Sequence, residues 1–296
     1  MLSVFLSIFV GFLVFWLVAP ALPWLFRLVA PLLRRLRPAL AADLLFLLEL
    51  VPCAAACIAV CLFVLPGFAT WEPKHSQENV PGIVLVISLF ALAMFARSLL
   101  LACKDLRRSH SVAERGAMIA VVGCVRPRVI VAAEAHSLLE VEELDSVLDH
   151  ERAHVQRQDN LRLFLSRIWE RLTPGASRLA PLRQERLRQT ELAADESAAT
   201  SIHAALRLAS ALVKVANTSF LEHGALASTF AGTQSQFQLG DRVHRLLNCK
   251  PTAQRRLEVV VDALALATIT AGIVVLAMDT RVQYGCYRLL EKIVSG

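Results

Sequence analysis

Long apolar stretches dominate the hydrophobic pattern of the chain. Residues 1–26 contain no charged side chain, and further apolar stretches run over 44–68, 81–103 and 259–278. A helix that crosses the hydrocarbon core of a bilayer needs about 20 apolar residues. The pattern therefore predicts a mainly helical membrane protein with four transmembrane helices. A signal peptide is the alternative for the first stretch, but no Lys or Arg precedes this stretch and it is too long.

The charges between the apolar stretches predict the orientation of the helices. Positive residues follow the first and third stretches directly, as Arg27, Arg34, Arg35, Arg37, Lys104, Arg107 and Arg108. The segment after the second stretch contains Glu72, Glu78 and only one Lys. Because positive residues favour the cytoplasmic side of a membrane, we expect the N-terminus to lie outside and the segment after the third helix to lie in the cytoplasm.

These expectations divide the chain into four parts. A three-helix transmembrane region over 1–104 precedes a cytoplasmic domain over 105–256, a fourth transmembrane helix over 257–279 and a short external tail over 280–296. The positive-inside rule does not support the last crossing, because the tail contains Arg281, Arg288 and Lys292.

The composition agrees with a membrane location. Hydrophobic residues make up 56% of the chain, charged residues 19%, and the mean hydropathy is +0.53, whereas a soluble domain is about 45–50% apolar and about 25% charged. This excludes a disordered chain and a small disulfide scaffold. The net charge of +6 is typical of a positive cytoplasmic face, so we expect no direct nucleic-acid binding. The seven cysteines form no CxxC pair, which predicts free thiols.

Three charged residues fall inside the predicted transmembrane helices: Glu49, Arg97 and Asp262. Intramembrane charges generally pair or serve a function. The hypothesis is that Glu49 or Asp262 pairs with Arg97 across the bundle. The alternative is that each side chain extends independently to the membrane interface.

The cytoplasmic segment has a different pattern. Short, partly β-branched runs over 117–123 and 129–131 flank Arg126-Pro127 and predict a β-hairpin; a buried helix is the alternative. Beyond the hairpin, the spacing of apolar residues predicts helices over 141–172, 181–199 and 203–220, a loop over 224–240, and one or two helical turns over 239–247. We therefore expect an α+β insert made of helices and a small hairpin or sheet.

The first of these helices contains an H-E-x-x-H motif, formed by His150, Glu151 and His154. Positions i and i+4 share one face of a helix, so both imidazoles can bind one metal ion. Glu151 lies about one hundred degrees away around the helix, where it can act as a general base rather than as a ligand. The alternative is a solvated His/Glu pair, which the apolar neighbours Val147 and Leu148 disfavour.

A second helix can complete the site. A catalytic zinc needs a third protein ligand, and Glu191 and Asp195 lie four residues apart in a helix with small neighbours. We expect Glu191 to be the third ligand. We expect Asp195 to accept the second N–H of His150, because such carboxylates orient ligating imidazoles. The alternative for this pair is an acidic, solvated helix.

An oxyanion stabiliser should also exist in a peptide-hydrolysing site. The only tyrosines, Tyr284 and Tyr287, fall in the predicted external tail and cannot serve. The remaining candidates are Arg242, His203, His223, His244 and Arg245.

The segment 147–160, VLDHERAHVQRQDN, resembles the core motif of the BlaR/MecR-type antirepressor membrane metallopeptidases. The segments 126–131, RPRVIV, and 191–195, ELAAD, are similar to this family as well. The segment 241–243, DRV, resembles a downstream family segment, which favours Arg242 among the candidate oxyanion stabilisers. The layout of three helices, a cytoplasmic zinc insert and a fourth helix is also similar, so the resemblance covers roughly residues 1–280. It implies a gluzincin-like peptidase of a bacterial inner (plasma) membrane that binds one Zn²⁺ per chain through His150, His154 and Glu191, with Glu151 as catalytic base.

The resemblance also implies partners. The expected substrate is a polypeptide, either a cytosolic transcriptional repressor or the chain itself, in regulated or signalling proteolysis. In the best-known members a large external penicillin-binding sensor follows the last helix, whereas only residues 280–296 follow it here; direct β-lactam sensing is therefore not expected. Two alternatives stay open. One is a membrane quality-control or prenyl-protein-type protease with the same metal motif, and the other is a non-catalytic membrane signalling scaffold.

Overall fold

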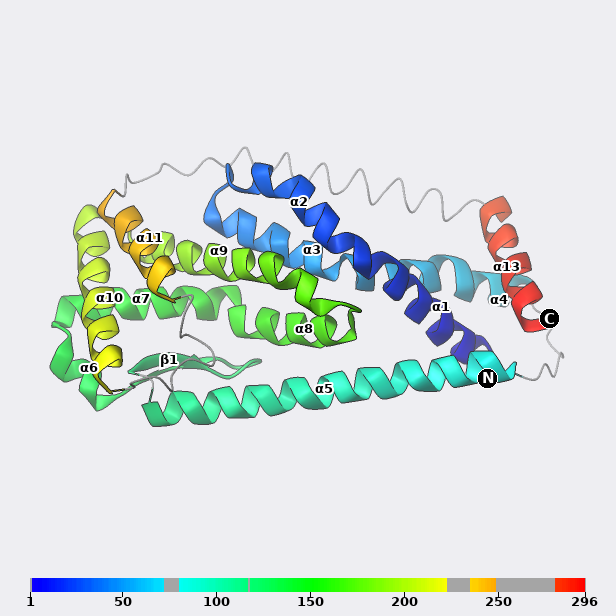
Figure 1. The fold of residues 1–296 in the computed structure, drawn as a ribbon, viewed down its shortest axis with the longest axis horizontal. Helices are drawn as coiled ribbons and strands as arrows, with labels where there is room; N and C mark the ends of the chain where they lie inside the picture. Colours follow the sequence, from blue (N-terminus) through cyan, green and yellow to red (C-terminus); the bar gives the residue numbers. More distant parts are fainter. Residues whose placement is uncertain (1, 72–79, 117, 223–234, 249–279, 296) are drawn as a thin grey trace.

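The computed structural model describes residues 2–71, 80–116, 118–222, 235–248 and 280–295. These residues form a mostly helical structure with one small two-stranded sheet. The 35-residue helix α5 (Gly82–Gly116) runs along most of the long axis of the molecule, whereas α10 (Ile202–Glu222) and α13 (Thr280–Ser295) run across this axis at opposite ends (Figure 1).

Three helical stretches are long and apolar enough to cross a membrane: Leu2–Leu33, Pro38–Val64 and Gly82–Arg108. They confirm the first three predicted spans by length and composition, whereas the predicted fourth span lies outside the described residues. The first stretch comprises α1 (Leu2–Val18), the short η1 (Ala19–Ala21) and α2 (Leu22–Leu33). The second comprises α3 (Pro38–Ala59) and η2 (Val60–Val64), and α4 (Leu65–Trp71) follows it. The tail forms a helix, α13 (Thr280–Ser295), and the orientation stays a prediction.

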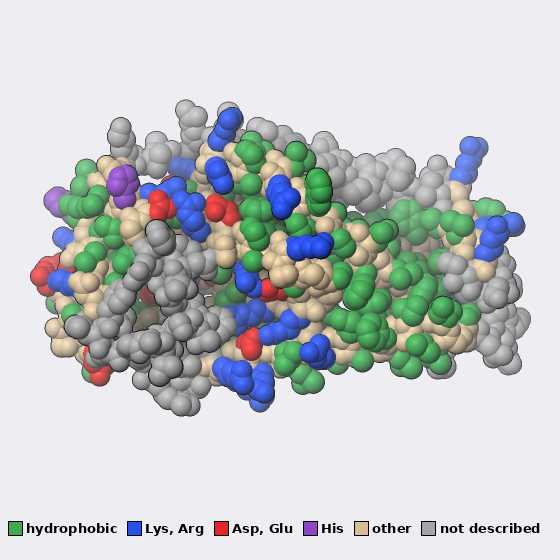
Figure 2. Space-filling model, in the orientation of Figure 1, with side chains coloured by type: hydrophobic (Ala, Val, Ile, Leu, Met, Phe, Trp, Pro, Cys, Tyr) green, Lys and Arg blue, Asp and Glu red, His purple; other side chains and the backbone are tan. Residues whose placement is uncertain are grey.

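The distribution of side chains differs between the two ends of the molecule. In Figure 2, hydrophobic side chains cover much of the half that contains α1 and the start of α5, while charged side chains gather over the other half and on α13. Exposed apolar residues such as Leu17, Ile83 and Phe90 belong to the first half. Large exposed apolar surface of this kind is typical of a segment that faces lipid rather than water.

The described residues between α5 and α13 form the sheet and seven further helical elements. The strands are β1 (Ile119–Val122) and β2 (Arg128–Val131). The helical elements are α6 (Ala133–Leu138), α7 (Val141–Arg157), α8 (Asp159–Leu172), η3 (Ala176–Leu179), α9 (Ala180–Ala198), α10 (Ile202–Glu222) and α11 (Ser235–Leu247). The predicted loop over 224–240 is wrong for residues 235–240, which begin α11 with an amphipathic run, and its first part lies outside the described residues.

The predicted hairpin is confirmed as an antiparallel pair of strands in which Ile119 lies opposite Val131. Gly123 directly follows β1 and has φ +99°. A Cβ at this position would lie 2.8 Å from the carbonyl oxygen of Arg126, so the turn requires glycine. The side-chain amide of Asn160 donates to the carbonyls of Val121 and Gly123, at 3.1 and 2.9 Å. This contact fixes the outer edge of β1 against α8.

The predicted single helix over 141–172 is interrupted at one residue. Gln158 has φ 54° and ψ 39°, the left-handed conformation that costs a non-glycine residue about 1–2 kcal/mol. Helix α7 ends before Gln158 and α8 begins after it. The helical periodicity continues through this position, which is why the sequence predicted no break.

The start of α7 is fixed by Glu143, which is only 5% exposed. The side chain of Glu143 accepts a hydrogen bond from the backbone N–H of Glu140, in a capping box. The same carboxylate accepts hydrogen bonds from Ser210 and Lys214 of α10. Burial would raise the pKa of Glu143, but these contacts, above all that with Lys214, hold it below its ordinary value of 4.5.

Replacing Glu143 by Ala is expected to destabilise the protein by about 1–2 kcal/mol at pH 7, because a helix cap and its hydrogen bonds are lost. The pKa of Glu143 is lower in the folded state. Its stabilisation is therefore present above the ordinary pKa and is lost as the pH falls through the folded value. Thermal unfolding in detergent, followed by circular dichroism, should show a difference from wild type that shrinks between pH 7 and pH 3. The exposed Glu142→Ala is the control, and an equal effect of both variants would contradict the argument.

The first turns of α3 pack against α9 rather than against lipid. Leu45 and Leu48 share a buried cluster with Leu179 and Leu182, at the start of α9. Figure 1 shows α3 and α9 side by side, and among the described helices α3 contacts none as extensively as α9. The second apolar stretch therefore packs against the helix that carries Glu191 and Asp195.

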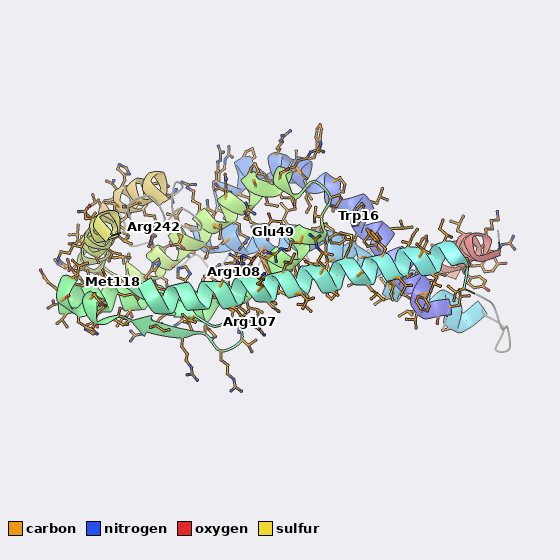
Figure 3. The ribbon with its side chains drawn as sticks, turned by 60° about the horizontal axis from the view of Figure 1, so that its bottom comes forward. Trp16, Glu49, Arg107, Arg108, Met118 and Arg242 are labelled. Atoms are coloured by element: carbon orange, nitrogen blue, oxygen red, sulfur yellow. The ribbon has the colours of Figure 1, made fainter. Side chains whose placement is uncertain are left out.

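The predicted Glu49–Arg97 pair does not form. Glu49 instead accepts a hydrogen bond at 2.9 Å from Nε of Arg186 on α9, and a second bond from the Ser166 hydroxyl on α8. Figure 3 labels Glu49 in the middle of the molecule, and Arg97 is exposed. The reason is the packing of α3 on α9, which brings Arg186 to Glu49. Asp262 lies outside the described residues.

Candidate metal centre

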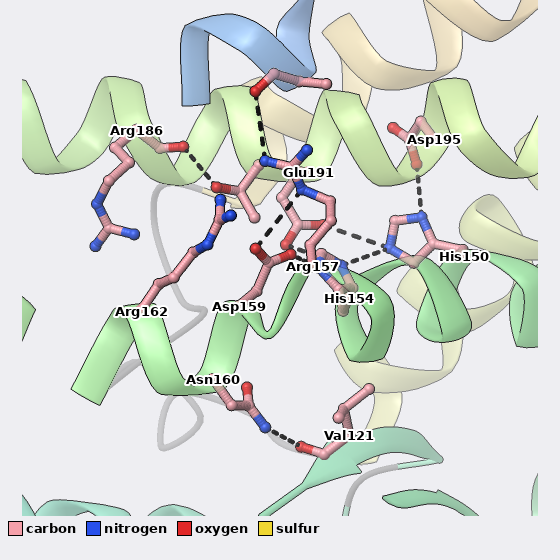
Figure 4. Close-up of polar contacts among 12 residues, drawn as sticks. Val121, His150, His154, Arg157, Asp159, Asn160, Arg162, Arg186, Glu191 and Asp195 are labelled. Carbon is pink, nitrogen blue, oxygen red and sulfur yellow. Dashed lines mark hydrogen bonds and ion pairs between the residues drawn. The ribbon is translucent and has the colours of Figure 1, made fainter. Parts of the chain in front are cut away.

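Two neighbouring helices bring three ligand-type side chains together. His150 and His154 lie on one face of α7, and Glu191 reaches them from α9 (Figure 4). The two Nε2 atoms are 3.2 Å apart, and each lies 3.7 Å from an oxygen of Glu191. The three residues chosen from the sequence as metal ligands are therefore neighbours in the structure.

The three donor atoms fit a tetrahedral metal ion. Zinc binds imidazole nitrogen and carboxylate oxygen at about 2.0–2.2 Å, so two ligands of a tetrahedron lie about 3.3 Å apart. The two Nε2 atoms, 3.2 Å apart, are close to this value, and each imidazole lies 3.7 Å from a different oxygen of Glu191. Among the described residues, this His-His-Glu group is the one cluster in which three such atoms lie within 4.8 Å of one another. His150, His154 and Glu191 could hold a metal ion and leave one position open.

Each imidazole has a carboxylate on its second nitrogen. Nδ1 of His150 lies 3.0 Å from Oδ1 of Asp195, an ion-pair contact without hydrogen-bond geometry. Nδ1 of His154 lies 2.7 Å from Oδ2 of Asp159. Carboxylates in this position fix the tautomer and orientation of a ligating ring and raise its basicity. Both rings are therefore oriented with Nε2 towards the common site.

Sequence reasoning assigned no role to Asp159. In a continuous helix the residue five positions after His154 is rotated by about 140° and would face away from the ring. The break at Gln158 turns Asp159 back towards His154. The only available signal was a carboxylate shortly after the motif, which helical periodicity places on the wrong face.

Arg242, from α11, lies beside the same carboxylates. Its guanidinium contacts both oxygens of Asp195 at 2.7 Å and Oε2 of Glu191 at 3.0 Å. Nη2 of Arg242 is 3.5 Å from Nε2 of His150. Of the candidates for an oxyanion stabiliser, Arg242 is the one that the structure brings to the site.

The other candidates lie elsewhere. His203 is exposed at the start of α10, His244 is exposed and contacts Asn248, and Arg245 forms an ion pair with Asp241. His223 lies outside the described residues. His203, His244 and Arg245 do not line the cavity that contains the motif, so the structure does not support them as stabilisers.

The charges of the site are strongly coupled. Burial would lower the pKa of His150, but its contacts with Asp195 and Glu191 raise it to about 9. Burial would raise the pKa of Glu191, but His150 and the charge of Arg242 lower it to about 2. The pKa of Asp195 is likewise held below its ordinary value by His150 and Arg242, against the effect of burial. Two ionised carboxylates therefore face two imidazoles and one guanidinium.

Glu151 faces the same cavity but belongs to none of these ligand pairs. Burial raises the pKa of Glu151 above 4.5, and the neighbouring histidines only partly offset this effect. The cavity has a volume of about 510 Å³, and Glu151, Arg242, Asn160 and the strand residues 119–121 are among its lining. Met118 and Arg242 both lie at the end of the molecule away from α13 (Figure 3). The cavity can accept a chain segment that runs past Glu151 and the ligand group.

Comparison with known proteins identifies no relative: the sequence matches no family model, no curated protein and no solved structure. The likeness to the BlaR/MecR-type metallopeptidases therefore stays a prediction that rests on the motifs themselves.

Proposed function

We propose that this chain is a zinc-dependent endopeptidase of a bacterial inner membrane that hydrolyses peptide bonds on the cytoplasmic side in regulated proteolysis. The observation that carries the proposal is the arrangement of His150, His154 and Glu191 around one point, with Glu151 facing the same cavity. The expected stoichiometry is one Zn²⁺ per chain. The three apolar helices support a membrane location.

The residues of the site suit peptide hydrolysis. When bound, zinc would polarise the scissile carbonyl and lower the pKa of the attacking water. Glu151 accepts the proton of that water and later donates it to the leaving amine. Its raised pKa suits this double role, because a catalytic acid/base works best when its pKa is near the operating pH. Arg242, close to His150 and Glu191, is placed to stabilise negative charge on the carbonyl oxygen.

The part of the outer edge of β1 around Ile119, which Asn160 does not occupy, is the proposed binding site for an extended peptide. Alternate residues of a strand direct their backbone groups to the same edge. The carbonyls of Val121 and Gly123 bond to Asn160 at the edge away from β2, so Ile119 presents its backbone groups on that edge as well. Ile119 lines the cavity beside Glu151, and an added strand there would pass the catalytic base.

The test of the proposal is comparative terminal proteomics. Cells that express wild type are compared with cells that express Glu151→Gln at the same level. We expect new protein termini only with wild type, and these would distinguish a repressor, the chain itself or a membrane protein as the substrate. If no terminus depends on Glu151 in any condition tested, the enzyme proposal fails and the alternative of a signalling scaffold gains support.

A further inference from the structure

We propose that Asp43, on the membrane helix α3, is a positioning residue for the metal centre: it fixes the break between α7 and α8 and orients His154 through Arg157 and Asp159. The inference rests on the proposed function only in taking His154 as a metal ligand. It adds that the second membrane helix belongs to the support of the site.

The carboxylate of Asp43 bridges the two sides of the helix break. Arg157 is the last residue of α7, and its Nη2 donates to Oδ1 of Asp43 at 2.9 Å. Arg162, in the first turn of α8, donates to the same oxygen. Gln158 lies between these two arginines in the left-handed conformation. One acidic group on α3 therefore ties together both helices that meet at the break.

The contact continues from Arg157 to the metal ligand. Nε of Arg157 is buried, makes no hydrogen bond to any described residue, and lies 3.7 Å from Oδ1 of Asp159. The other oxygen of Asp159 is 2.7 Å from Nδ1 of His154. The side chains of Arg157, Asp159 and His154 are 18%, 11% and 13% exposed. Because they are shielded from solvent, their charges interact more strongly than surface charges would.

The break is the point at which a small movement would matter most. Asp159 directly follows Gln158, so the angle between α7 and α8 sets the position of the Asp159 carboxylate relative to His154. Without the charge of Asp43, Arg157 and Arg162 would lose their shared partner and repel each other across the break. Asp43 therefore acts on the orientation of an imidazole that it does not touch.

The chain offers a matched control for this inference. Asp105 of α5 forms an ion pair with Arg171 of α8, which also joins a membrane helix to the helix after the break. Among the described residues, neither side chain of this pair forms a hydrogen bond or ion pair with Arg157, Asp159 or His154. Asp105→Asn therefore removes an equivalent interhelical charge pair without affecting the path to His154.

The experiment measures the zinc affinity of the purified full-length protein in detergent, by competition with a chromogenic chelator. Asp159→Asn is expected to weaken zinc binding about 10- to 100-fold, as loss of a carboxylate behind a ligating imidazole typically does. Asp43→Asn should weaken binding about five- to tenfold, Asp105→Asn less than about twofold, and Asp43→Glu should recover most of the loss. The double variant of Asp43→Asn and Asp159→Asn should bind zinc no more weakly than Asp159→Asn alone, because both residues act on the orientation of His154 through the same contacts.

Two results would overturn the inference. One is a zinc affinity of Asp43→Asn within twofold of Asp105→Asn, and the other is a double variant whose loss is the product of the two single losses. If Asp43→Asn does not fold, Arg162→Gln is measured in its place, because this variant removes one side of the bridge. Arg162→Gln should weaken zinc binding several-fold. An unchanged zinc affinity of Arg162→Gln would then overturn the inference. If wild type binds zinc and Asp43→Asn behaves like the control Asp105→Asn, only this inference is refuted. If wild type binds no zinc, the proposed function is refuted as well.

Discussion

Glu151→Gln is expected to lower peptide hydrolysis by about 10³-fold while zinc binding stays intact. General acid/base groups contribute about 10²–10⁴-fold to enzymatic rates, and a glutamine amide cannot accept the proton of the attacking water. Glu151 is not one of the three clustered ligands, so its replacement should leave the affinity for the metal unchanged.

The measurement pairs hydrolysis of a substrate found by proteomics with zinc content determined by atomic emission. Glu142→Gln is the matched control, because Glu142 lies on the same helix but is exposed and does not line the cavity. A Glu151→Gln protein that keeps more than about a tenth of wild-type activity would show that another group acts as the base.

His154→Ala is expected to abolish zinc binding and hydrolysis together. Removal of one of three protein ligands should weaken binding at least about 100-fold, because removal of an indirect partner alone costs 10- to 100-fold. The variant also leaves Asp159 without the imidazole that it contacts at 2.7 Å. Wild type should retain one zinc per chain after dialysis, and His154→Ala close to none.

His203→Ala is the control for this second experiment, since His203 is exposed on α10 and does not line the cavity. Equal zinc content in wild type and His154→Ala would mean that the ion binds elsewhere, and the site proposed for it would be wrong. If His154→Ala lost zinc but kept full hydrolytic activity, the reaction would not depend on the metal.

The sequence predicts the parts of the site that depend on local spacing. Residues four apart on one helix share a face whatever the rest of the fold does, and this places His150 with His154 and Glu191 with Asp195. The β-hairpin follows from short β-branched runs around a turn in the same way, and the apolar spans follow from length and composition alone.

The parts that the sequence did not predict depend on contacts between distant segments. Glu49 and Arg186 are separated by 137 positions, and nothing in the local pattern around Glu49 indicates a partner outside the membrane. Arg242 was a candidate from the sequence, but its contact with Asp195, 47 positions away, was not predicted. The conformation of Gln158 is set by its surroundings, because glutamine has no preference for positive φ. Its role, and with it that of Asp159, becomes visible only in three dimensions.

The packing of α3 on α9 has a practical consequence for work on this protein. A water-soluble fragment that starts after the third apolar helix would omit Asp43, Leu45 and Glu49, and would uncover the apolar surface formed by Leu179 and Leu182. Arg186 would then be left without its carboxylate partner. Biochemical preparations should therefore retain the N-terminal helices, and a truncated fragment that aggregates or lacks activity would say little about the competence of the intact chain.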